Sequence, residues 1–184
     1  YETNWVLTGS LYPPNTPLLE KFQNLSEVVT LKEEHSVQTH RLDDIAEING
    51  ADFLKMDIQG SELKVLENAT NLLETTLVLQ VEVEFVELYK GQPLFADVDS
   101  FLRSRGFQFH CFDGGLAGRT FKPLVVNDNI NKRINQVLWA DAFYVRDWMN
   151  LGSLSKEQLI TYAILSLDIL KSPDLTHLIL SQFD

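Results

Sequence analysis

The sequence predicts an α/β domain built on a largely parallel sheet with helices on both faces. From residue 52 onward, short apolar or alternating segments typical of strands take turns with helical segments. Such alternation is typical of crossover connections between parallel strands. The last two strand-like segments, 107–113 and 137–147, have no long helix between them. We therefore expect those two strands to pair antiparallel at one edge of the sheet.

Composition and charge narrow the class of protein. A chain of 184 residues is long enough for one domain with a full core. Its net charge of −11, without any run of Lys or Arg, argues against a nucleic acid partner. No apolar run reaches the roughly 20 residues that span a bilayer. The single cysteine, Cys111, forms no internal disulfide, so we expect a reducing, cytoplasmic location. The four histidines lack metal-binding spacing, so no metal site is expected.

The first fifty residues carry weak, mixed patterns. The expected elements are a strand at 4–8, a turn-rich loop at 9–15, a helix within 16–24 and a strand at 35–42. Asp43 and Asp44 fit the N-cap of a short helical turn that ends near Gly50.

The middle of the chain is more regular. Segment 52–58 is a short apolar run typical of a buried strand, and 61–73 has apolar residues at helical spacing. Segment 77–85 alternates, with leucine and valine on one face and Gln80, Glu82 and Glu84 on the other. A helix through Val98, Phe101 and Leu102 then ends at Gly106.

The last residues form a separate helical tail. Ser155 and Gln158 make a capping box, and the helix that they open is apolar almost all round. Ser172 and Pro173 interrupt it before a second helical segment. We therefore divide the chain into a domain at 1–147 and a helical C-terminal extension at 148–184. The extension must be buried against the sheet or against a second subunit, as in a homodimer.

Acidic residues gather where two neighbouring strands end. Ligands of open parallel sheets bind outside the carboxyl ends of the strands. Asp57 ends one strand and Glu82 and Glu84 approach the same rim on the next, which makes them candidate site residues. Glu62 fits a role at the helix N-terminus better, and Glu84 has the alternative of a solvated, outward position.

The glycine-rich stretch DGGLAGR, residues 113–119, resembles a phosphate loop only superficially. No helix follows it, so it lacks the N-terminal amides that bind phosphate. We expect a flexible turn.

Five segments of the sequence carry a family resemblance: GSLYPPN (9–15), THRLDDI (39–45), LKMDIQGSELKVLENA (54–69), VEVEFVELYKGQPLFADVDSFLRSRGF (81–107) and WADAFYVR (139–146). Together they resemble the FkbM-type S-adenosylmethionine-dependent methyltransferases. LKMDIQGSELKVLENA resembles the family signature lKiDvEGaE..VL.ga, and VEVEFVELYKGQPLFADVDSFLRSRGF looks like the block that follows it. GSLYPPN, THRLDDI and WADAFYVR resemble a serine-rich loop, an LDdl segment and the closing strand. The blocks occur in the family's order over residues 1 to about 147.

This resemblance implies a Rossmann-like class I methyltransferase sheet and methyl transfer from S-adenosylmethionine to an oxygen of a small metabolite, sugar or lipid. It implies that Asp57, with Gln59 and Gly60, lies at the methyl and amino acid end of the cofactor. Glu84 or Glu82 would act as base or hydroxyl anchor. The loop with Ser10, Tyr12 and Asn15 would lie near the mouth of the substrate pocket, and Asp141 would have a structural role.

The chain departs from the family pattern in two ways. Gln59 stands where the family often has Glu, and the glycine-rich loop that wraps the cofactor has no counterpart. We therefore expect a sheet truncated on its N-terminal side, with segment 52–58 as an uncovered edge. Two alternatives stay open: a non-catalytic remnant or interaction module, and a nucleotide-sugar enzyme on a related fold.

Overall fold

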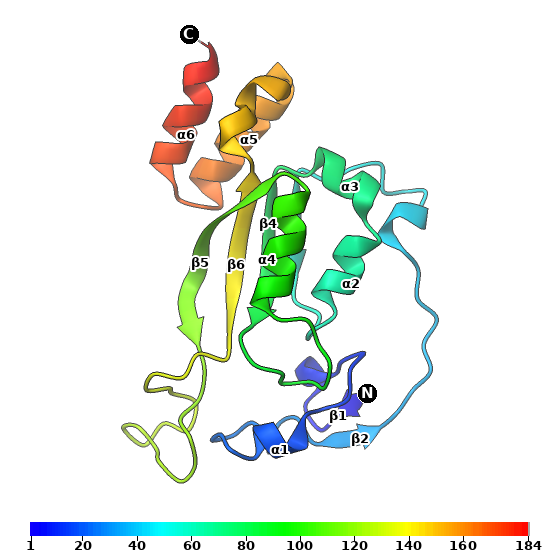
Figure 1. The fold of residues 1–184 in the computed structure, drawn as a ribbon, viewed down its shortest axis with the longest axis vertical. Coiled ribbons are helices and arrows are strands. Elements are labelled where there is room, and N and C mark those ends of the chain that lie inside the picture. The colour runs from blue at the N-terminus through cyan, green and yellow to red at the C-terminus, as the bar shows by residue number, and fades with distance from the viewer. Residues whose placement is uncertain (184) are drawn as a thin grey trace.

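A computed structural model describes residues 1–183 and shows a mixed four-stranded sheet (Figure 1). The strand order is β3 (Phe53–Met56), β4 (Val78–Glu84), β6 (Trp139–Arg146), β5 (Phe107–Ala117). β3 and β4 are parallel, and β6 runs antiparallel to both of its neighbours. The antiparallel pairing of the last two strands is confirmed. The prediction of a largely parallel sheet is wrong. β6 is inserted antiparallel between β4 and β5, so β3 and β4 are the one parallel pair among the described strands.

Helices and chain segments cover both faces of this sheet. Leu79, Val81 and Val83 of β4 pack against α2 (Glu62–Glu67) and α4 (Phe95–Ser104). The alternate residues of β4 and β6 face the other way, where α5 (Lys156–Asp168) and α6 (Pro173–Leu180) cover one end. The first thirty residues cover the other end, at the carboxyl ends of β3 and β4 (Figure 1). Among the described residues β3 has one neighbour only, so its outer edge is unpaired.

The N-terminal region differs from the sequence prediction. It contains β1 (Glu2–Thr3), η1 (Val6–Thr8), α1 (Thr16–Leu19), β2 (Leu31–Glu33) and η2 (Leu42–Asp44). The predicted strand at 4–8 is wrong, because Thr8 N donates to Trp5 O and closes a 3-10 turn. The predicted strand at 35–42 is also wrong. Residues 35–41 are exposed and have no strand beside them, so no strand partner completes their backbone hydrogen bonding.

The helix predicted at 61–73 is two helices. α2 ends at Glu67 and α3 (Thr70–Thr75) begins after a break at Asn68 and Ala69. Asp43 caps α3 from a distance, since its carboxylate accepts from the backbone N–H of Asn71 (3.0 Å) and of Leu72 (3.1 Å). The prediction that Asp43 caps its own helical turn is therefore wrong; it caps a helix 27 residues further along the chain.

The end of β5 also corrects the sequence analysis. β5 continues to Ala117, so the predicted flexible turn at 113–119 is largely strand. Gly114 and Gly115 have φ angles of 62° and 89°, and the pairing with β6 shifts register there. Glycine is needed at these positions because left-handed backbone is costly for other residues.

The tail forms η3 (Trp148–Ser153), α5, α6 and η4 (Ser181–Phe183). The capping box is confirmed: Ser155 Oγ accepts from Gln158 N, and Gln158 Oε1 accepts from Ser155 N. Tyr162 is buried against the sheet and donates to Arg146 O at 2.7 Å. One side of the tail is thus buried on the sheet, while Ile160, Ile164 and Leu167 of α5 stay exposed.

The distant cap gives a stability prediction. Asp43→Ala removes the acceptor for the first amides of α3 and should lower the free energy of unfolding by about 1 kcal/mol. Asp44→Ala is the matched control. Among the described residues, the hydrogen bonds to α3 are made by the carboxylate of Asp43 and not by that of Asp44. Urea denaturation of both variants measures the difference. Equal losses would show that Asp43 is no cap.

Candidate functional site

Acidic side chains converge on a cavity at the carboxyl ends of β3 and β4. Asp57 follows β3 directly, and Glu82 and Glu84 are the last residues of β4 on one face. All three line a cavity of about 250 Å³. Thr8, Gln59, Tyr89 and Arg119 contribute its other polar groups. Its apolar wall is Trp5, Leu7, Leu19, Leu25, Val28, Val29, Leu88 and Trp139. The cavity combines a polar floor with a hydrophobic wall.

Gln59 connects the polar groups. Its Nε2 donates to Asp57 Oδ1 (2.7 Å) and to Glu82 Oε2 (2.9 Å), so one amide bridges both acids. Its Oε1 accepts from the hydroxyl of Tyr89 at 3.2 Å. The backbone of Gln59 is left-handed, with φ of 56°, a conformation that non-glycine residues adopt rarely. This turn therefore holds a strained conformation that places the amide between the two strands.

Glu84 of β4 is buried and Glu82 is half-buried, and the pKa of each carboxyl is raised. Burial, together with the charges of Glu84 and Asp57, raises the pKa of Glu82 to about 10. Burial and the charge of Glu62 raise the pKa of Glu84 to about 8. Glu84 is only 3% exposed, so the solvated, outward position considered for it is wrong. β4 has neighbours on both edges and cover on this face, which leaves Glu84 no access to bulk water.

Glu62 is the first residue of α2 and contacts the turn that follows β3. Its Oε1 accepts from Ile58 N at 2.8 Å, which holds the turn between β3 and α2. Burial raises its pKa although this hydrogen bond opposes the shift. The structural role expected for Glu62 agrees with this contact.

Arg119 supplies a positive charge on the opposite wall. Its guanidinium lies 5.0 Å from the centre of the Trp139 ring, and its Nε is buried with no hydrogen-bond partner among residues 1–183. Burial lowers its pKa. Arg119 forms no ion pair with the described acids. Arg119 therefore places a guanidinium beside the cavity, and its Nε–H is available to donate a hydrogen bond to a ligand.

The residues predicted near the pocket mouth lie behind its wall. Ser10 Oγ donates to Gln59 O at 2.6 Å, and Asn15 Nδ2 donates to Glu87 O at 2.8 Å. The Tyr12 ring lies 4.4 Å from Lys64 Nζ. These contacts fasten loop 9–15 to the turn after β3 and to the segment after β4. None of the three lines the cavity itself, and their role in substrate binding stays a prediction.

Gly60 serves the packing of the same turn. Its φ is 94°, and a Cβ atom here would lie 3.1 to 3.3 Å from the side chain of Gln92. The close approach that glycine permits is therefore to Gln92. Its predicted contact with a cofactor stays a prediction.

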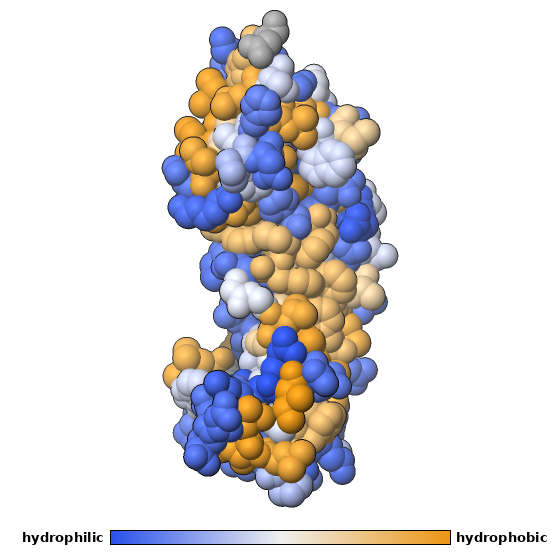
Figure 2. All heavy atoms as spheres, turned by 90° about the vertical axis from the view of Figure 1, so that its left-hand side faces the viewer, coloured by the Kyte–Doolittle hydropathy of each residue, from blue (hydrophilic) through white to orange (hydrophobic). Residues whose placement is uncertain are grey.

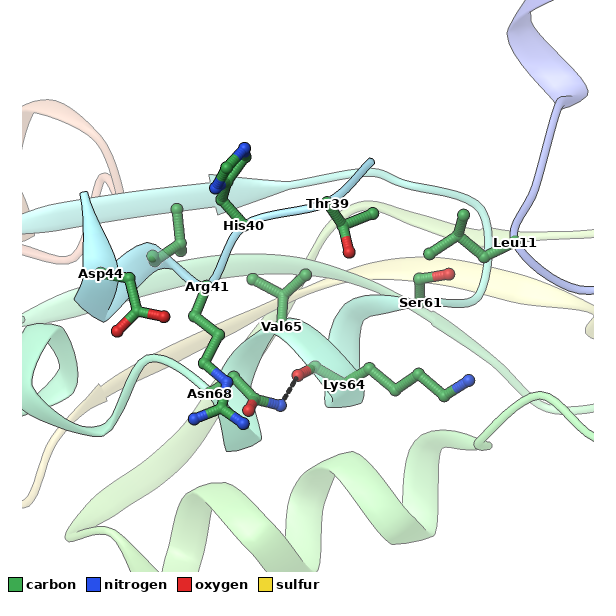
Figure 3. Close-up of a pocket in the computed structure, with 10 residues that line it drawn as sticks. Leu11, Thr39, His40, Arg41, Asp44, Ser61, Lys64, Val65 and Asn68 are labelled. Carbon is green, nitrogen blue, oxygen red and sulfur yellow. Dashed lines mark hydrogen bonds between the residues drawn. The ribbon is translucent and has the colours of Figure 1, made fainter. Parts of the chain in front are cut away.

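A second, larger hollow runs beside α2. It measures about 710 Å³ and lies between residues 39–44 and the helix, with Ser61 at one end (Figure 3). Figure 3 shows the long side chains of Arg41 and Lys64 along this hollow, with Asp44 at its far end. Ser61 is buried and its hydroxyl has no hydrogen-bond partner among the described residues. Since Ser61 follows Gly60 in the chain, the hollow and the acidic cavity flank the same turn.

Sequence reasoning missed several cavity residues. Tyr89 lies in the loop after β4, where no sequence pattern marks it as a site residue. Its hydroxyl also donates to Thr8 O at 2.8 Å. Arg119 was part of the glycine-rich stretch, and its basic charge in an acidic chain was an unused signal. Trp139 lies opposite Glu84 in the register of β4 and β6. Asp141 lies opposite Glu82, and burial raises its pKa.

A cluster of metal-ligand type, Glu2, Glu33 and His35, lies on the exposed β1–β2 pair. His35 Nε2 is 2.8 Å from Glu2 Oε2, and Lys32 Nζ is 3.6 Å from Glu2 Oε1. The ammonium of Lys32 and the hydrogen bond with His35 thus satisfy the Glu2 carboxylate without a metal ion.

The fold and the acidic cavity define a mixed α/β protein with a polar site at the carboxyl ends of its parallel strands. The model described as Methyltransferase FkbM domain matches residues 6–109, more than half of the chain, so the protein belongs to the FkbM methyltransferase family. No curated protein and no solved structure matches it. Within the described residues, each helix is too short or too polar to cross a bilayer.

The buried acids predict how stability depends on pH. In the unfolded chain Glu82 loses its proton near pH 4.3, whereas in the folded protein it keeps the proton up to about pH 10. The unfolded state therefore binds fewer protons between these values, and the free energy of unfolding falls as pH rises. Glu82→Gln should flatten the decline and make the protein more stable than wild type at pH 9, by about one to a few kcal/mol.

Denaturant unfolding from pH 5 to 9 measures this profile. Glu67→Gln, at an exposed position of α2, is the control and should leave the slope unchanged. A Glu82→Gln profile parallel to that of wild type would contradict a neutral Glu82.

Proposed function

We propose that this protein is an S-adenosylmethionine-dependent O-methyltransferase that acts on a hydroxyl group of a small metabolite, sugar or lipid. Membership of the FkbM family supports the reaction class. The observation that carries the assignment to a site is the convergence of Asp57, Glu82 and Glu84 on one cavity at the strand ends.

The residues of this turn fit the cationic end of S-adenosylmethionine. Its sulfonium and ammonium groups are positive, and carboxyl oxygens of Asp57 and Glu82 converge on Gln59 beside the cavity. When bound, the cofactor supplies an electrophilic methyl group. We assign Asp57 and Gln59 to the amino acid end, with Gly60 shaping the turn. The hollow beside α2, at about 710 Å³, has the size of a nucleoside site.

The two glutamates of β4 have different proton affinities and therefore different roles. A general base works best when its pKa lies near the working pH. Glu84, with a pKa of about 8, is the better base for the acceptor hydroxyl. Glu82, with a pKa of about 10, keeps its proton and anchors a hydroxyl as a hydrogen-bond donor. The apolar wall and Arg119 favour an acceptor with a hydrophobic body and a polar or anionic group.

Two substitutions separate these roles. Asp57→Asn should weaken S-adenosylmethionine binding at least tenfold, because it removes a negative charge at the cationic end of the cofactor. Glu84→Gln should bind the cofactor like wild type but lower methyl transfer roughly 100-fold, as expected for loss of a general base. Calorimetry measures binding, and transfer of a labelled methyl group to a pool of hydroxylated compounds measures turnover. Glu67→Gln is the control, and unchanged behaviour of Asp57→Asn would remove Asp57 from the site.

The runner-up function is a non-catalytic interaction module. It is favoured by the apolar surface of α5. Calorimetry on the chain, and on the chain with its native upstream residues, distinguishes the two functions. Binding in either form supports the enzyme, including the version in which upstream residues complete the cofactor site. Absence of binding in both forms favours the module. No described feature favours a nucleotide-sugar enzyme.

We also propose that the tail mediates a homodimer. Ile160 and Ile164 are 45% and 54% exposed and lie one turn apart on α5, with Leu167 on the same side. Covering these side chains with a second copy would remove apolar surface from water. The expected mass in light scattering is that of a dimer, and Ile160→Asp with Ile164→Asp should give a monomer. Thr161→Asp on the same helix is the control; a monomeric wild-type protein at micromolar concentration would refute the dimer.

The single, unpaired Cys111 supports a cytoplasmic location.

A further inference from the structure

Two separate segments that each contribute residues to the acidic cavity also carry exposed apolar side chains. One is η1 with its N-cap residue Trp5, where Trp5, Val6 and Leu7 are 48%, 83% and 66% exposed. The other is the β5–β6 loop, residues 118–138. Its exposed apolar residues are Phe121, Leu124, Val125, Ile130 and Ile134.

The two segments are held at the same end of the molecule. Phe121 stacks on Phe22 with ring centres 4.5 Å apart, and Lys122 Nζ lies 2.7 Å from Glu27 Oε1. Thr8, at the end of η1, donates through Oγ1 to Val28 O at 2.8 Å. Both segments therefore pack on residues 21–31. Trp5 and Leu7 from one segment and Arg119 from the other also line the cavity.

The loop has the opposite charge to the rest of the chain. Residues 118–138 contain four cations, Arg119, Lys122, Lys132 and Arg133, against one acid, Asp128, which gives a net charge of +3. The whole chain has a net charge of −11. Lys132 is exposed, and its ammonium has no ion-pair partner among the described residues. In Figure 2 hydrophobic and hydrophilic side chains lie interleaved over this lower end of the molecule.

We propose that this surface docks on an anionic lipid membrane, with the cavity mouth toward the lipid. Side chains such as Leu124 and Val6 would enter the boundary between headgroups and acyl chains, as apolar side chains of interfacial segments do. Lys132 would lie among the anionic headgroups, which attract basic residues near the surface. Each of these apolar side chains is exposed in the folded chain, so a lipid surface could bury several of them at once. The inference is independent of the methyl transfer reaction, since it rests on residues outside the acid cluster.

Sedimentation with vesicles tests this surface without any knowledge of the acceptor. The wild-type chain should sediment with phosphatidylcholine vesicles that contain phosphatidylglycerol, and binding should weaken as salt rises because salt screens the attraction. Lys132→Glu should lower partitioning roughly tenfold. Leu124→Ser, at a position 61% exposed, should also reduce binding, including at low salt.

Matched controls come from the opposite end of the sheet. Met149→Ser changes a side chain that is 72% exposed in η3, and Lys156→Glu reverses a charge at the start of α5. Both should bind vesicles like wild type. Failure of the wild-type chain to bind anionic vesicles at low salt would overturn the proposal, as would equal losses in the control variants. Retention on a polyglutamate resin without vesicle binding would overturn it in favour of an acidic macromolecule.

Discussion

The burial of β4 is the constraint on which the site depends. This strand has a neighbour on each edge and cover on both faces, yet its polar side carries Gln80, Glu82 and Glu84. Charged carboxylates in such a place are costly unless they are paired or neutralised. The protein meets this requirement with the bridging amide of Gln59, with a proton that Glu82 keeps up to about pH 10, and with a pKa of Glu84 raised to about 8. The chemistry available at the cavity follows from that neutralisation.

The cavity is assembled from segments that are far apart in the sequence. Tyr89 joins the segment after β4 to Gln59 and to Thr8, and Ser10 fastens the first loop to the same turn. The N-terminal region must therefore fold before Asp57, Glu82 and Glu84 face a closed cavity, because that region supplies most of the apolar lining. This dependence explains why the residues of loop 9–15 matter although they do not line the cavity.

The sequence predicted those parts of the fold that repeat with a clear period. The alternation in β4 and the capping box of α5 both reappear in the structure, because each depends on local spacing. The segment 35–42 has a similar local pattern but lacks a neighbouring strand, so tertiary context decides against it. Asp57, Glu82 and Glu84 were found because strand ends are predictable. Tyr89 and Arg119 were missed because they come from loops whose path depends on contacts with residues 8 and 139.

The cap on α3 has a consequence for local dynamics. A short helix whose first amides are bound by its own N-cap opens by fraying, independently of distant residues. In this protein the amides of Asn71 and Leu72 are bound by Asp43 instead, so they are released to solvent when residues 42–44 detach. Those residues also form one side of the hollow beside α2. Hydrogen exchange at two amides of α3 thus reports the closing and opening of a wall more than twenty residues upstream.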